Sequence, residues 1–119
     1  MDELRGKLRK KAYEAAYLYY KIQHYNAAVV AFKNFLYEYP EYEDVEKIDY
    51  LIVKSLNRYA EESYKHKKIE RYTEEIKAYE TFAAKYSNSK YLQELQKEYN
   101  LAKQYIEKIN KEVKGYEKN

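Results

Sequence analysis

Residues 25–40 read YNAAVVAFKNFLYEYP, and 47 positions later residues 72–87 read YTEEIKAYETFAAKYS. The two segments carry aromatic residues at the same successive offsets of seven, three and four: Tyr25, Phe32, Phe35 and Tyr39, then Tyr72, Tyr79, Phe82 and Tyr86. These offsets place the four rings of each segment on one face of an α-helix. Another helical stretch precedes each segment, so the repeating unit is a helical hairpin that needs a neighbour to bury its apolar face.

The composition favours an all-α chain that forms a single domain. The 119 residues include two glycines and one proline, which are too few to build the turns of a sheet. Charged residues of both signs make up 36% of the chain, and a net charge of +3 does not suggest a nucleic-acid ligand. The absence of cysteine excludes disulfides and thiolate metal sites. No apolar run approaches the roughly 20 residues that a membrane-spanning helix needs.

The helical periodicity predicts two hairpins followed by a long capping helix. The first hairpin covers about 3–39, the second about 44–86 and the capping helix about 89–114, within one domain over 1–119. Asn26 is expected to cap the second helix and Pro40 to follow its end, while Gly115 is expected to stop the last helix. In the first helix, the apolar residues expected to face the core include Leu4, Leu8, Ala15, Ala16, Tyr19 and Ile22.

The last helix has two interpretations. Its apolar residues alternate at spacings of three and four, in the order Leu92, Leu95, Tyr99, Ala102, Ile106, Ile109 and Val113. Such a seam is typical of a coiled coil, in which this helix would pair with another chain. It also suits a helix that closes the open end of a repeat array, and this second interpretation is favoured because terminal repeats commonly need a cap.

The spacing of the small and aromatic residues resembles the tetratricopeptide (TPR) consensus. The residues that carry this resemblance are Ala16, Tyr19, Tyr25, Ala28, Phe32 and Pro40. The longer strings KKAYEAAYLYYKIQHYNAAVVAFKNFLYEYP, RYAEES and ERYTEEIKAYETFAAKYSNSKYLQE resemble the C-terminal half of the BamD family, in its Bacteroidetes form. BamD proteins are TPR lipoproteins of the outer-membrane β-barrel assembly machinery. The second repeat departs from the consensus, because Ser87 replaces the proline and Glu75 stands where the first repeat has Ala28.

The resemblance implies a TPR-like α-solenoid fragment that acts as a non-enzymatic scaffold on the periplasmic side of the outer membrane. Its implied partners are the membrane-proximal POTRA domain of BamA, other lipoproteins of the machinery and unfolded β-barrel substrates. Family members begin with a signal peptide and a lipidated cysteine that anchors them to the membrane, followed by further repeats, and the resemblance without these features suggests a fragment. The repeat core is expected to comprise Ala16, Tyr19, Ala28, Phe32, Phe35, Tyr79 and Phe82.

A tyrosine stripe on the first helix is a candidate binding surface. Tyr13, Tyr17 and Tyr20 recur at helical spacing beside the expected core stripe. In TPR arrays the first helix of each hairpin lines the concave groove, so these rings resemble a peptide-binding surface. The alternative function is therefore a generic TPR adaptor that binds a peptide in its groove. A second interpretation of the same stripe is that it packs against a further repeat upstream.

Charge supplies a second candidate surface. Lys65, Lys67, Lys68 and Arg71 cluster at the predicted turn of the second hairpin, whereas the 40–44 loop is acidic. The up-and-down course of the helices places these two segments at opposite ends of the array. Such a separation would steer and orient a charged partner.

No motif in the sequence indicates catalysis or a cofactor. His24 and His66 are the only histidines, and both are expected in turns without the neighbours of a metal site. The acidic loop lacks the alternating oxygen ligands and the glycine of a calcium loop. Glycine-rich phosphate loops, nucleophile elbows and paired catalytic carboxylates are not apparent. The sequence therefore predicts a binding protein with no cofactor, no metal and no nucleic-acid partner.

Overall fold

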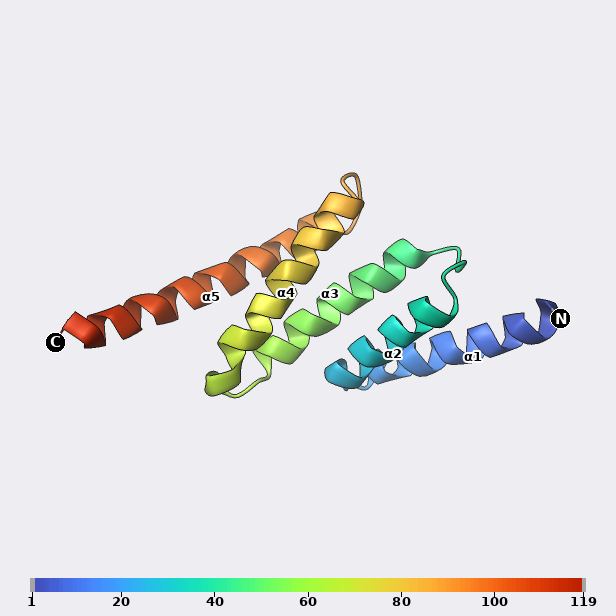
Figure 1. The fold of residues 1–119 in the computed structure, drawn as a ribbon, viewed down its shortest axis with the longest axis horizontal. Helices are drawn as coiled ribbons and strands as arrows, with labels where there is room; N and C mark the ends of the chain where they lie inside the picture. Colours follow the sequence, from blue (N-terminus) through green and yellow to red (C-terminus); the bar gives the residue numbers. More distant parts are fainter. Residues whose placement is uncertain (1, 119) are drawn as a thin grey trace.

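The computed structural model describes residues 2–118, which form five helices and no strand. They are α1 (Asp2–Lys21), α2 (Tyr25–Glu38), α3 (Val45–Glu61), α4 (Lys65–Lys85) and α5 (Leu92–Lys118). The helices run up and down in sequence order as an elongated array of 68 × 30 × 19 Å (Figure 1). Each helix packs chiefly against the next one, and α3 also touches α5. The fold is thus all-α, as a TPR-like helical repeat fragment should be.

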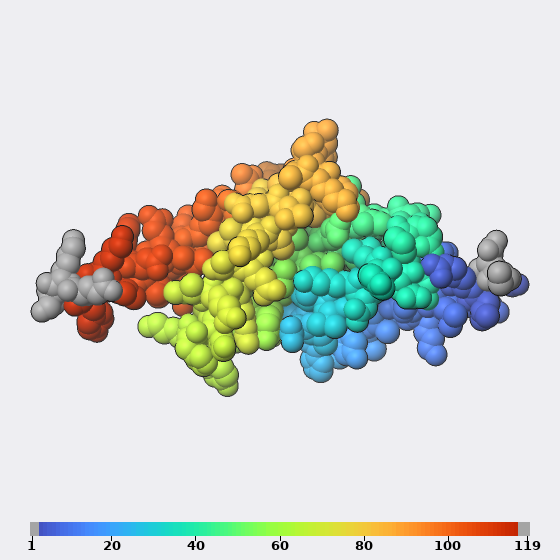
Figure 2. All heavy atoms as spheres, viewed as in Figure 1, coloured from blue at the N-terminus to red at the C-terminus, as the bar shows by residue number. Residues whose placement is uncertain are grey.

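The core forms where the repeated aromatic segments meet α3. Side chains of α3 lie between those of α2 and α4 in the space-filling view (Figure 2). Phe32 and Phe35 of α2 are buried with Ala16 of α1 and with Ile48 and Leu56 of α3. A second cluster joins α3 to the last two helices through Val53, Tyr79, Phe82 and Leu95. Since α3 contributes to both clusters, it connects the two hairpins.

The structure corrects part of the sequence expectation for α1: Ala16 is buried as expected, but most of the other residues expected in the core are on the surface. Tyr19, expected in the repeat core, is on the surface with 40% of its area exposed, and Leu4, Leu8, Ala15 and Ile22 are exposed as well. Ala16 of α1 and Ala28 of α2 are fully buried in one core cluster. Tyr13, Tyr17 and Tyr20 pack against this cluster, and the larger aliphatic residues of α1 lie outside it.

Three local expectations also need correction. His24, rather than Asn26, occupies the N-cap position of α2, and its side chain makes no capping hydrogen bond. Helix α5 continues through Gly115 to Lys118, and a side chain at position 115 would meet open space. Helix α4 begins at Lys65, so the cations expected in a turn belong to its first turns. The cap of α3 is conventional, because the Asp44 carboxylate accepts a hydrogen bond of 3.2 Å from the Lys47 backbone N–H.

Candidate interaction surfaces

The tyrosine stripe of α1 is supported by the chain's own core. Tyr13 and Tyr17 stack with ring centroids 5.9 Å apart and planes at 10°, and Tyr20 lies 6.0 Å from Tyr17. Tyr13 also packs 5.8 Å from Tyr42, in the segment before α3, and against the edge of Phe35. All three rings of the stripe are half-buried. The three rings therefore pack against the core and do not form an isolated exposed patch.

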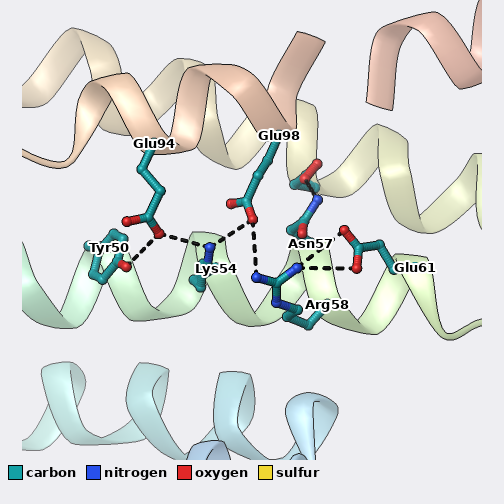
Figure 3. Close-up of polar contacts among 8 residues, drawn as sticks. Tyr50, Lys54, Asn57, Arg58, Glu61, Glu94 and Glu98 are labelled. Atoms are coloured by element: carbon teal, nitrogen blue, oxygen red, sulfur yellow. Dashed lines mark hydrogen bonds and ion pairs between the residues drawn. The ribbon is translucent and has the colours of Figure 1, made fainter. Parts of the chain in front are cut away.

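A polar network that the sequence analysis did not predict links α3 to α5 (Figure 3). The Lys54 ammonium lies 2.8 Å from a carboxylate oxygen of Glu94 and 2.8 Å from one of Glu98. Tyr50 donates a 2.7 Å hydrogen bond to Glu94, and Arg58 lies 3.7 Å from Glu98. The α3 members recur every four residues and the two glutamates are four apart, so one face of each helix presents them together.

The pKa shifts of Lys54 and Glu94 show how the opposite charges of this network affect one another. Burial lowers the pKa of Lys54, but hydrogen bonds from its ammonium to Glu94 and Glu98 outweigh that effect and leave the pKa raised. Burial raises the pKa of Glu94, but the hydrogen bonds that it accepts from Lys54 and Tyr50 leave the pKa lowered. The charged forms thus stabilise one another. The network joins α5 to α3, and within the described residues Glu98 Oε1 is its one buried oxygen without a hydrogen-bond partner.

A buried carboxyl group lies between α3 and α4, beside this network. Glu75 is 1% exposed, and its Oε1 accepts a 2.6 Å hydrogen bond from the Asn57 side-chain amide. Among the residues that the structure describes, Glu75 Oε2 and Asn57 Oδ1 find no hydrogen-bond partner. Burial raises the pKa of Glu75 to about 7, although the hydrogen bond from Asn57 acts in the opposite direction. The repeat supplied a signal for this burial, since Glu75 occupies the position of the fully buried Ala28 in the first repeat.

The predicted basic cluster divides into two parts. Lys65 and Lys67 are exposed at the corner between α3 and α4, whereas Arg71 lies 4.1 Å above the Tyr59 ring and donates a 2.7 Å hydrogen bond to Ser63 Oγ. Lys68 lies 5.7 Å from the Tyr105 ring centroid. Lys68 and Arg71 therefore help to hold α4 in place, and Lys65 and Lys67 are the cations that a partner can reach.

Two exposed rings accompany these cations, and we call the resulting surface the basic corner, defined as residues 64–67. Tyr64 is 81% exposed, and its ring stacks on the exposed His66 at a centroid distance of 6.2 Å. Lys67 pairs with Glu70 at 3.6 Å on the open surface, a geometry that contributes little stability. The basic corner therefore combines an exposed aromatic group with exposed positive charge.

The opposite end of the array is not purely acidic, which corrects the expected charge separation. Arg5, near the start of α1, lies 2.7 Å from Glu41 of the acidic loop and donates a 3.0 Å hydrogen bond to the Glu38 carbonyl. Its guanidinium also lies 4.8 Å from the Tyr39 ring centroid. The basic start of α1 and the acidic loop thus share one end of the molecule.

Comparison of the sequence with models of protein families shows which family the chain belongs to. The family model YfiO, described as an outer membrane lipoprotein, matches residues 6–118. The chain belongs to the YfiO family of outer membrane lipoproteins. No curated protein matches the sequence. The YfiO assignment agrees with the resemblance to BamD proteins, and the match covers all of α5 and both hairpins except the first residues of α1.

The described part of this YfiO family member contains neither a candidate metal site nor a candidate membrane span. Within residues 2–118, no three His, Cys, Asp or Glu side chains are placed to hold a metal ion together. Among the helices described, none combines the length and apolar character needed to cross a bilayer. The surfaces most suited to an interaction are the tyrosine stripe, the basic corner and the exposed face of α1.

Proposed function

We propose that this chain is a non-enzymatic docking module of the outer-membrane β-barrel assembly machinery. In this proposal it lies on the periplasmic side of the outer membrane and binds the periplasmic region of BamA. The observation that carries the proposal is the YfiO family match over residues 6–118, together with the BamD-like strings of the sequence. Two stacked hairpins, joined by core clusters to which α3 contributes on both sides, suit such a role, because they hold their surface side chains in fixed relative positions.

The basic corner is the surface that we assign to this docking. Tyr64 offers an exposed ring that a partner can bury, and aromatic anchors of this kind dominate binding energy at many interfaces. Lys65 and Lys67 flank the rings of Tyr64 and His66 with positive charge. Charges at the rim of an interface act mainly on the association rate and on orientation. The proposal therefore assigns affinity to the ring and steering to the two lysines.

The double variant Lys65→Glu/Lys67→Glu is expected to slow association with the BamA periplasmic region by about three- to tenfold at low salt. Its association rate should also depend less on salt concentration. The helix should remain folded, because glutamates in the first turn interact favourably with the helix dipole. Lys68 and Arg71 stay unchanged because both make contacts within the chain. Surface-immobilised binding kinetics over a salt series measure both effects.

A matched control is the double variant Lys33→Glu/Lys77→Glu, which makes the same charge change at exposed positions of α2 and α4. This variant should associate at close to the wild-type rate. Equal slowing by both double variants would mean that net charge alone is responsible. An unchanged association rate in the corner variant would remove the basic corner from the interface.

A further inference from the structure

A groove lies between α2 and α4, above the middle of the array. Helix α3 forms its floor, and atoms of α3 show between those of α2 and α4 on this face of the molecule (Figure 2). The groove has a volume of about 350 Å³, near the lower end of the range for ligand pockets. The apolar part of its lining consists of Leu36 from α2, Ile52 and Val53 from α3, and Ala78 and Phe82 from α4. Three of these five, Ile52, Val53 and Phe82, are core residues, so the groove opens directly onto the core.

The groove is an internal feature of the array. One side belongs to the first hairpin and the other to the second, and both sides pack against the same helix, α3. Helices α1 and α5 stand at the two edges of the array (Figure 1). A further repeat stacked on either edge would therefore leave the groove open.

The rim of the groove carries an excess of positive charge. Lys33 from α2 and Lys85 from α4 line it together with Asp49 from α3. The Asp49 carboxylate is already engaged, because it lies 3.3 Å from the Lys85 ammonium and accepts a 2.6 Å hydrogen bond from the Tyr86 hydroxyl. Lys33 is exposed, and no carboxylate of residues 2–118 lies within ion-pair distance of it. The groove thus offers an unpaired cation beside an apolar floor.

A shallower hollow on α4 continues the groove. It shares Thr81 and Lys85 with the groove, and its other lining residues are Lys77, Glu80 and Ala84. A stretch of polypeptide can therefore place one side chain in the groove and run on across α4. We propose that the groove binds an extended segment of a partner protein, which inserts an aromatic side chain between α2 and α4 and places an acidic residue against Lys33.

Each part of this ligand matches a part of the groove. An aromatic side chain buries a large apolar area at a single position, and such anchors dominate many interfaces. The ammonium of Lys33 can pair with the acidic neighbour of the ring and can also interact with the ring face. The acidic residue belongs on the α2 side, because Asp49 would repel a carboxylate on the α3 side.

The groove is separate from the basic corner. Ala78 follows Lys67 by 11 residues along α4, which is roughly 17 Å at 1.5 Å per residue. The inference therefore goes beyond docking to BamA and does not depend on it. The experiment uses peptides and the full chain, without BamA, so the two proposals can fail independently.

The test uses a fluorescein-labelled peptide with one central phenylalanine flanked by glutamates. In one companion peptide alanine replaces the phenylalanine, and in another lysines replace the glutamates. Fluorescence anisotropy with the full chain should show a dissociation constant below about 1 mM for the first peptide, at least about fivefold tighter than for either companion. Amide NMR shifts caused by the peptide should centre on the groove, at Leu36, Val53 and Phe82.

The variant Thr81→Phe places a ring of the chain's own over the groove and should lower the affinity for the first peptide about tenfold or more. Thr81 is exposed, so the helical circular dichroism should remain that of the wild type. The control Gln104→Phe puts the same ring at an exposed position of α5, which lines neither hollow, and should bind like the wild type.

The variant Lys33→Glu tests the charge preference without touching the apolar floor. It should weaken binding of the glutamate-flanked peptide several-fold and strengthen binding of the lysine-flanked one, whereas Lys108→Glu, at an exposed position of α5, should change neither. Equal binding of the three peptides, no binding at about 2 mM, or amide shifts centred outside the groove would overturn the proposal. Self-association that Thr81→Phe abolishes, without peptide binding, would assign the groove to a second copy and overturn it as well.

Discussion

Replacement of Phe32 by alanine is expected to lower the free energy of unfolding by about 3–5 kcal/mol. Phe32 is fully buried in the cluster that joins α1 and α2 to α3, so the change leaves a cavity where the hairpins meet. Tyr37→Ala, on the exposed side of the same helix, is the matched control and should cost less than about 0.5 kcal/mol. Urea unfolding followed by circular dichroism measures both. Similar losses for the two variants would contradict the repeat packing described above.

The second large effect concerns the buried Glu75 and depends on pH. The folded state raises the pKa of this carboxyl group from its ordinary value of 4.5 to about 7, chiefly through burial. Between these two values the folded chain binds more protons than the unfolded chain does. The stabilising contribution of the neutral group is therefore complete below about pH 4.5 and is lost as the pH rises through about 7. The shift corresponds to about 3 kcal/mol at 1.36 kcal/mol per pKa unit.

Glu75→Gln should remove this loss, because glutamine stays neutral and keeps an oxygen that can accept the Asn57 hydrogen bond. The variant is expected to be more stable than wild type by about 3 kcal/mol at pH 8 and nearly equal to it at pH 4.5. The charged groups Lys54, Glu61 and Glu98, which act on Glu75, remain in both proteins. Glu74→Gln, at the exposed neighbouring position, serves as the control. Parallel stability profiles of wild type and Glu75→Gln between pH 4.5 and 8 would show that Glu75 does not control this dependence.

The repeated aromatic spacing was enough to predict an all-α repeat. It identifies which face of α2 and of α4 is buried, because Phe32, Phe35, Tyr79 and Phe82 lie on a single apolar stripe of each helix. The same periodicity was not decisive for α1, where apolar residues occur on two faces. There the face of Ala16, which is buried in one cluster with Ala28, is the inward one, whereas hydrophobicity alone favoured the face of larger side chains.

The polar parts of the candidate surfaces were harder to predict for a physical reason. The contacts from Lys54 to Glu94 and Glu98 join residues that lie 40 or more positions apart, so they require the packing of α3 against α5. The sequence predicts the basic cluster as one unit. In the structure Arg71 lies over the Tyr59 ring and Lys68 over the Tyr105 ring, so these two residues separate from the rest of the cluster. The burial of Glu75 is the exception, because the sequence repeat aligns this residue with Ala28 and so carries a signal for it.

The most direct test of the docking proposal is equilibrium binding of the wild-type chain to the BamA periplasmic region from the same organism. Isothermal titration calorimetry should show saturable binding at a stoichiometry of one to one. The affinity should fall as salt is raised, because the basic corner contributes positive charge to the encounter. The absence of binding at about 100 µM of each protein, with both shown to be folded, would contradict the account.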